Sequence, residues 1–236
     1  MTTTPWFDGC EAVRVCSNDR LNRPDGRWVI LLVNSSGSTK ERILGAAEVL
    51  FAQRGFDGAS LRQLTAAAGV NLAAVNYHFG SKDKLVEQVF RRRLDALNER
   101  RLAALAKVAG ADGTTLEDVL AAYIRPALEL SHDESGSLFM RVLARAFAEH
   151  DDTLRQFLSE NYGHVMRQFT AEFARLLPQL SKPELYWRID LVTGALTHAM
   201  SGFGMIQRKS DVSEHAHREQ TAQHLIRFAV AGLSHP

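Results

Sequence analysis

The chain has few of the residues and patterns that mark secreted or membrane proteins. Only two of its 236 residues are cysteine, Cys10 and Cys16, which make neither a disulfide framework nor a zinc site without neighbouring ligands. The apolar run WVILLV at 28–33 is far shorter than the roughly 20 residues of a membrane-spanning helix. Acidic residues near the chain start, Asp8 and Glu11, stand where a secretory signal needs basic ones. We therefore expect a cytoplasmic protein with no membrane partner.

Catalytic motifs are also missing. The sequence has no G-x-S-x-G elbow, no H-E-x-x-H and no Walker loop, so we expect no enzyme, no catalytic residue, no metal and no cofactor. The alternating pattern of β-strands is absent too, which favours an all-α fold. A net charge of +1 excludes a uniformly basic nucleic-acid-binding surface. Between residues 38 and 98, however, nine Lys and Arg against six Asp and Glu leave an excess of +3, the sign that phosphate contacts require.

The stretch 60–84, SLRQLTAAAGVNLAAVNYHFGSKDK, is the most informative part of the sequence. Ser60 with Gln63 forms a capping box that predicts a helix from Leu61, and Gly69 ends it. Asn71 caps a second short helix over 72–79, and Ser81 caps a third. Two helices joined by a glycine-containing turn are typical of a helix-turn-helix, whose second helix enters the DNA major groove. An ordinary helical hairpin would show the same spacing.

The amino-acid sequence of this stretch resembles that of the TetR family of bacterial regulators. The matching residues are Ala68, Gly69, Val70, Tyr77, His78, Phe79, Ser81, Lys82 and Leu85, and the match extends back through ILGAAEVLFAQRGFDGASL at 43–61. The resemblance implies an all-α fold: an N-terminal three-helix helix-turn-helix DNA-binding domain and a larger helical domain for ligand binding and dimerisation. It also implies double-stranded operator DNA as a partner and a homodimer formed through the last two helices.

The expected DNA contacts come partly from the resemblance, which places Tyr77, His78 and Lys82 at the phosphate backbone. Asn76 stands where a tyrosine is commoner in the family, and its amide suits a bidentate contact with adenine. Arg62 is either a base contact or a solvated helix residue. The full candidate set is Ser60, Arg62, Thr65, Leu72, Ala73, Ala74, Asn76, Tyr77, His78 and Lys82. Arg91, Arg92 and Arg93 look like a phosphate clamp, but consecutive helix positions diverge, so we expect a solvated face.

Capping and helical periodicity divide the chain into three parts. Residues 1–37 fit no helical period and suggest a poorly ordered arm: a minor-groove arm, a segment outside the natural start of translation, or a dispensable tail. We expect the DNA-binding domain over 38–98 and the ligand-binding and dimerisation domain over 99–236. In the latter, Thr114 with Glu117 predicts the capping box of a helix, and 131–137 predicts a loop. Later helices are expected over 138–150, from a cap at 151 or 152 to about 177, over 184–207, and from 213 to about 232.

The second half is rich in aromatic residues and methionine. Such residues usually form only a core, but the resemblance implies an apolar effector pocket. Segments 138–147, 183–196 and 198–204 further resemble PsrA-type regulators, which implies a long-chain fatty acid or acyl-CoA as effector. The candidate effector residues are Phe139, Met140, Leu143, Phe147, Phe169, Phe173, Trp187, Met200 and Phe203. Arg141, Arg145, Arg188 and His198 are candidates for binding an acyl carboxylate.

Two other features have ordinary explanations. Glu214, His217 and His224 share one helix face and could bind a metal, although a solvated or interface role fits them better. Small residues in the last two helices, including Gly194 and Ala195, favour the close helix approach of a dimer interface. A helical acyl-binding protein or hydrolase that never binds DNA remains the alternative of a different class.

Overall fold

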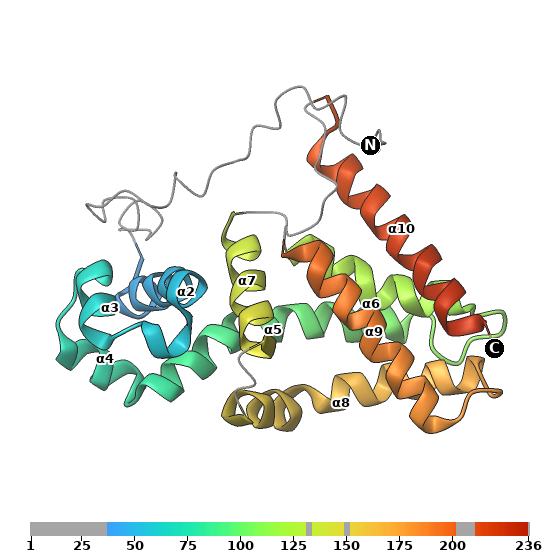
Figure 1. Cartoon of the computed structure of the whole chain (residues 1–236), viewed down its shortest axis with the longest axis horizontal. Helices are drawn as coiled ribbons and strands as arrows, with labels where there is room; N and C mark the ends of the chain where they lie inside the picture. Colours follow the sequence, from blue (N-terminus) through green and yellow to red (C-terminus); the bar gives the residue numbers. More distant parts are fainter. Residues whose placement is uncertain (1–36, 131–133, 149–151, 202–210, 236) are drawn as a thin grey trace, which may run out of the picture.

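The computed structural model describes residues 37–130, 134–148, 152–201 and 211–235, and every regular element in these ranges is a helix (Figure 1). The all-α prediction is therefore confirmed for the described residues. Apart from Gly37, the predicted arm lies outside them. The helices are α2 (Thr39–Gly58), α3 (Leu61–Ala68), α4 (Leu72–Phe79), α5 (Lys82–Ala106), α6 (Leu116–Leu130), α7 (Glu134–Ala148), α8 (Asp152–Leu176), α9 (Lys182–Met200) and α10 (Glu214–Ser234). None of these helices is long and apolar enough to cross a membrane.

Helices α2, α3 and α4 gather at one end of the molecule, and we call them, with the first turns of α5, the head (Figure 1). The head begins where the sequence predicted, because the Ser38 hydroxyl accepts a hydrogen bond from the Glu41 backbone at 3.3 Å. Gly55 interrupts α2 with a φ of 74°, which lets Phe56 turn back against Phe51 at 5.2 Å between ring centroids.

Helix α5 leads out of the head and packs against α2, α6 and α8. Its Phe90 is fully buried, 6.1 Å from the Phe56 ring of the head and 5.5 Å from the Phe139 ring of α7. Aromatic contacts thus run without a break from the head into the second half. The buried residues form one continuous core cluster, so the two halves are not separated by a solvated linker.

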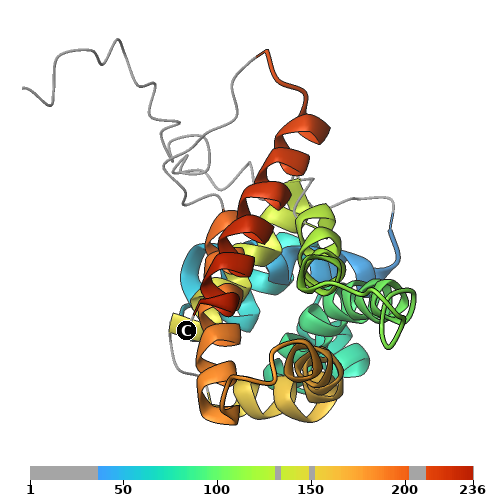
Figure 2. The ribbon, with the colours of Figure 1, turned by 90° about the vertical axis from the view of Figure 1, so that its right-hand side faces the viewer.

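The remaining helices form the larger body behind α5. Helix α6 packs against α5 and α10, and α8 packs against α5, α6 and α9. Helices α9 and α10 contact each other and lie together on one side of the body (Figure 2). Arg188 of α9 fixes this pair, because its guanidinium donates to the backbone carbonyls of Gly232 at 3.0 Å and Leu233 at 3.2 Å near the end of α10.

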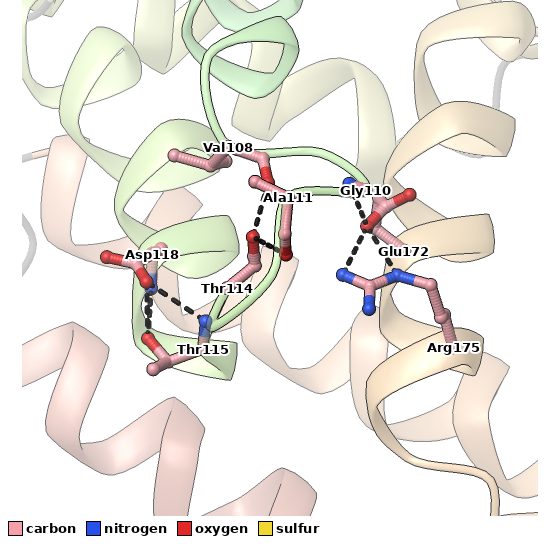
Figure 3. Close-up of polar contacts among 8 residues, drawn as sticks. All are labelled: Val108, Gly110, Ala111, Thr114, Thr115, Asp118, Glu172 and Arg175. Carbon is pink, nitrogen blue, oxygen red and sulfur yellow. Dashed lines mark hydrogen bonds and ion pairs between the residues drawn. The ribbon is translucent and has the colours of Figure 1, made fainter.

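The cap of α6 lies one residue later than predicted (Figure 3). Thr115, not Thr114, caps the helix: its hydroxyl accepts from the Asp118 backbone at 3.2 Å, and its own backbone N–H donates to the Asp118 carboxylate at 3.0 Å. The Thr114 hydroxyl is engaged elsewhere, since it donates to the Val108 and Ala111 carbonyls and closes the preceding turn. Glu117 therefore has no part in the box.

Two helix limits in the body also differ from the predictions. Helix α7 begins at Glu134, so the last part of the expected loop at 131–137 is helical. Gly136 is buried there, and packing of α7 on α2 outweighs the weak helix propensity of glycine. Helix α9 ends at Met200, with Ser201 as its C-cap, and the rest of its predicted extent lies outside the described residues.

Candidate functional site: an exposed helix in the head and a cavity in the body

The turn between α3 and α4 has the geometry that the sequence predicted. Ser60 and Gln63 cap each other reciprocally at 3.1 and 3.3 Å, and Gly69 ends α3 in the left-handed region with a φ of 63°. Asn71 then caps α4 by accepting from the Ala74 backbone at 2.9 Å. The guanidinium of Arg42 on α2 donates to the carbonyl oxygens that end α3, at 2.6 and 2.8 Å. The helix-turn-helix is therefore held both by its own caps and by α2.

Helix α4 has one buried face and one exposed face. Val75 and Phe79 are buried against the head core. Leu72 is 50% exposed and Tyr77 is 86% exposed, while Asn76 is also open to solvent. An exposed polar and apolar helix face of this kind is what a recognition helix presents to a DNA groove.

The other predicted DNA-contacting residues divide by exposure. Ala73, His78, Ser60 and Arg62 are exposed, and Ala74 and Lys82 are partly buried. Thr65 is only 9% exposed, and its hydroxyl donates to the Arg62 carbonyl at 3.0 Å. The structure thus gathers these candidates around α3, α4 and the start of α5, with Thr65 turned inward.

The three consecutive arginines of α5 do not form the solvated face that we expected. Arg93 pairs with Glu48 of α2 at 3.1 Å, and Arg92 pairs with Glu41 of the same helix at 2.9 Å. Arg91 points the other way, towards α8, where it donates to Asn161. Because divergent side chains find separate partners on two flanking helices, the run ties the head to the body.

These pairings leave fewer cations for phosphate contacts. Lys84 pairs with Glu87 at 2.8 Å, whereas Arg62 and Lys82 form no ion pair with any described residue. Both belong to the helix-turn-helix or directly follow it, so they are the head's candidates for DNA backbone contacts.

A cavity of about 460 Å³ lies in the body between helices α5 to α9. This volume falls within the roughly 300–1,000 Å³ range of small-molecule sites. Most of the wall is apolar, and it includes residues of all five helices. The apolar lining residues are Leu94, Leu97, Ala127, Met140, Leu143, Leu158, Val165, Met166, Leu196 and Met200.

Of the predicted effector residues, Met140, Leu143 and Met200 line this cavity. Phe169 and Phe173 are buried in the core beside it, with Phe169 5.2 Å from the ring of the lining residue Tyr123. Phe139 packs on Phe90 at the junction with the head. The side chain of Phe147 and the whole of Phe203 lie outside the described residues, and Trp187 is 68% exposed on α9.

The cavity also has polar groups that the sequence analysis missed. Arg101 of α5 donates to the Tyr123 carbonyl at 3.0 Å, and its guanidinium carbon lies 4.0 Å from the centre of the Tyr123 ring. Burial is the largest influence on this group and lowers the pKa of Arg101. In the sequence Arg101 follows Arg100 and looks like one more solvated helix cation. Only the fold shows that it lines the cavity.

The residues predicted to bind an acyl carboxylate are placed differently. Arg188 is occupied with α10, and Arg141 and His198 are exposed. The side chain of Arg145 lies outside the described residues. Glu214, His217 and His224 form no metal-binding cluster, since the described part of the chain contains no group of three or more suitable ligands.

An exposed apolar face lies on α9 and α10. Trp187 and Leu191, one turn apart on α9, are 68% and 66% exposed, and Phe228 on α10 is 64% exposed. Exposed side chains of this size and apolarity are typical of interaction surfaces. Tyr186, the residue before Trp187, is 46% exposed and also lines the cavity.

A capped helix-turn-helix with an exposed second helix, joined to a larger helical body, defines the class of helix-turn-helix DNA-binding regulators. Comparison with known families agrees. The model described as "Bacterial regulatory proteins, tetR family" matches residues 43–89, and "Tetracyclin repressor-like, C-terminal domain" matches residues 121–232. Together the two matches cover more than half of the chain, which therefore belongs to the TetR family of transcriptional regulators.

Curated relatives are transcriptional regulators as well. The chain is 42% identical over 52 residues to the probable regulator YttP of Bacillus subtilis, a match of 22% of this chain and 25% of that one. It is 25% identical over 145 residues to the repressor KstR2 of Rhodococcus jostii, covering 61% of this chain and 64% of the relative. The chain thus spans less than two thirds of the length of either relative.

Solved structures share the fold. PfmR from Thermus thermophilus, a TetR family regulator, superposes with a TM-score of 0.58 at 20% identity, over 85% of this chain and 100% of that one. A TetR-like regulator from a Rhodococcus species gives a TM-score of 0.56 at 21% identity, over 84% and 97%. At these identities the likeness concerns the fold alone.

Proposed function

We propose that this regulator is a repressor that binds a pseudo-palindromic operator as a homodimer and is released by a small apolar effector. The observation that carries the proposal is the exposed face of α4, held by a fully capped helix-turn-helix. Two such helices in successive major grooves lie about 34–36 Å apart. We propose the DNA-binding domain over residues 38–98 and the ligand-binding and dimerisation domain over 99–236.

Within the head, we assign direct base contact to Asn76, whose amide is exposed on α4. Tyr77, His78 and Lys82 are the proposed phosphate contacts, with Arg62 beside them. Leu72 and Ala73 offer only apolar contacts, of the kind made with thymine methyl groups. Phosphate contacts set affinity and its salt dependence, whereas Asn76 sets sequence preference.

The apolar face of α9 and α10 is the proposed dimer interface. Its Trp187, Leu191 and Phe228 are large apolar side chains, the type that anchors protein interfaces when buried. Arg188 holds α9 and α10 together independently of any partner. The face is therefore formed before association.

Helix α7 supports coupling between effector and DNA. Its consecutive residues Phe139 and Met140 have different neighbours, since Phe139 packs on Phe90 at the head junction and Met140 lines the cavity. An effector that binds one arrangement of α7 more tightly than another shifts the equilibrium between them. The shift in free energy equals the difference between the two binding free energies, and the head follows α7. DNA and effector must then weaken each other reciprocally. A long-chain fatty acid or acyl-CoA is the effector class that we propose for the cavity.

Fluorescence anisotropy with the DNA upstream of the gene tests the DNA-binding part. Asn76→Ala should lose about 1–3 kcal/mol on operator DNA and little on random DNA. Lys82→Ala should weaken binding to both and reduce the slope of log affinity against log salt by about 1. Equal losses for Asn76→Ala on both DNAs would show that this residue only positions the backbone. Absence of binding at low salt would end the proposal.

A further inference from the structure

The polar groups of the cavity are unevenly charged. Two of its lining residues are cations, Arg101 and Arg167, and none is an aspartate or glutamate. Arg167 is exposed, whereas Arg101 is partly buried and forms no ion pair with any described residue. A guanidinium has five N–H donors. Among the described residues, Tyr123 supplies the acceptors found for Arg101, through its carbonyl oxygen and its side chain, so other donors of the guanidinium have no protein acceptor there.

A second group in the same wall is incomplete. Thr170 of α8 is 8% exposed, and its hydroxyl has no hydrogen-bond partner in the described part of the chain. The threonines of α9 in the cavity differ, because the Thr193 and Thr197 hydroxyls each donate at 2.9 Å to a carbonyl one turn back. A buried hydroxyl without a partner destabilises the folded protein unless another group accepts or donates the missing hydrogen bond.

A series of ring contacts leads from Arg101 to the residue before Thr170. Arg101 stacks on the Tyr123 ring, which contacts the Phe169 ring at 5.2 Å, and Thr170 is the next residue of α8. Both Arg101 and Thr170 line the one cavity. The positive group and the unpartnered hydroxyl suit the anionic end of an amphiphile, and the apolar wall beside them suits its apolar end.

We propose that Arg101 and Thr170 form an anion subsite, which makes the effector an amphiphile with a carboxylate end and an apolar body. The carboxylate accepts hydrogen bonds from the Arg101 guanidinium and the Thr170 hydroxyl, and the apolar body lies against Met140, Leu143 and Met200. This inference rests on the proposed effector role of the cavity and narrows the effector to acids.

The test compares dodecanoate with dodecanol, which differ only in the charged end, by competition with a fluorescent fatty acid on the full-length protein. Because hydrogen bonds to charged groups contribute about 1.5–3 kcal/mol, wild type should bind the acid roughly ten- to hundredfold more tightly than the alcohol. Arg101→Gln should abolish this preference, and Arg101→Lys should keep part of it. Arg167→Gln, which removes the exposed cation, is the matched control and should keep the preference.

Thr170→Val provides a readout that does not depend on the charge. The substitution keeps the shape and removes a hydroxyl without a protein partner, so the unliganded protein should be as stable as wild type or more so in urea. Affinity for dodecanoate should nevertheless fall about three- to tenfold, with affinity for dodecanol changed less. A purely structural role for Thr170 predicts a loss of stability and no change in ligand preference.

The possible failures are distinguishable. Equal binding of acid and alcohol by wild type would overturn the anion subsite and leave the apolar cavity as the effector site. Loss of the preference in Arg167→Gln alone would overturn the assignment to Arg101. If dodecanoyl-CoA binds and dodecanoate does not, the carboxylate would be the wrong anion, and the subsite would be assigned to a phosphate group. Failure of every ligand to bind would overturn both this inference and the proposed effector. If Arg101→Gln does not fold, the affinities of Thr170→Val for dodecanoate and dodecanol test the anion subsite instead.

Discussion

Arg93 of α5 donates two hydrogen bonds, each of 3.1 Å, to the carboxylate of Glu48 on α2. Glu48 is only 3% exposed, so this pair lies in the core between the head and α5. On the opposite side of α5, Arg91 donates to Asn161 of α8 at 2.7 Å and lies 5.0 Å from the Phe157 ring. Neighbouring arginines thus fix α5 to the head and to a helix that lines the cavity.

Glu48→Gln should therefore destabilise the protein. The change leaves the Arg93 charge without its carboxylate, and we expect a loss of about 3 kcal/mol, at the low end for a broken buried pair because the Arg93 side chain stays 18% exposed. Glu41→Gln is the control. The side chains of its pair are more exposed, 48% for Glu41 and 33% for Arg92, so this pair should contribute under about 1 kcal/mol to the free energy of unfolding. Urea unfolding measures both. A Glu48→Gln loss no larger than that of Glu41→Gln would contradict the prediction.

Gly69→Ala should also destabilise the head. Its φ of 63° costs an L residue about 1–2 kcal/mol, and an added Cβ would meet the Arg42 Nη2 atom at 2.9 Å. Arg42 must then give up hydrogen bonds to the end of α3, which brings the expected loss to about 2–3 kcal/mol. Gly45→Ala, in open space within α2, should instead stabilise the head by about 0.5–1 kcal/mol. The same sign of change for both variants would refute this account.

The cap of α6 should respond to pH. Hydrogen bonds from the Thr115 hydroxyl and backbone lower the pKa of Asp118 below its ordinary 3.8 (Figure 3). A lowered carboxyl pKa means that this contribution is fully present above the unfolded pKa of about 3.9 and is lost as pH falls through the folded pKa. Thr115→Ala should raise the pKa of Asp118 towards its ordinary value and cost about 1 kcal/mol at neutral pH. NMR titration of the Asp118 carboxyl decides, and an unchanged pKa in the variant would disprove the role of Thr115.

Dimerisation and DNA contact should be separable by mutation. Trp187→Ala removes an exposed anchor of the α9–α10 face and should weaken the dimer at least about thirtyfold, as expected for a loss of about 2 kcal/mol or more. Tyr77→Ala removes a side chain that is 86% exposed on α4 and should leave the dimer intact while lowering DNA affinity. Sedimentation equilibrium measures the association. A Trp187→Ala protein that remains as dimeric as wild type would exclude this face as the interface.

Local patterns predicted the head well because its signals act over a few residues. The Ser60 box, the left-handed Gly69 and the Asn71 cap are each complete within one turn of helix, so the amino-acid order is enough to place them. At α6 the same reasoning chose the wrong threonine. Two adjacent threonines each precede an acidic residue by three positions, and the contact of Thr114 with the Val108 carbonyl decides between them.

The sequence by itself determined the class of this protein, because caps, helical periodicity and the 43–85 resemblance all depend on residues close together in the chain. Tertiary structure decided the partners of the charged residues. The 91–93 arginines were predicted to be solvated and instead join three helices, and Arg101, for which the sequence pattern predicted no role, lines a cavity. The physical reason is that a charged side chain meets its partner through space, on a helix that is distant in the sequence: Arg91 and Asn161 are 70 positions apart.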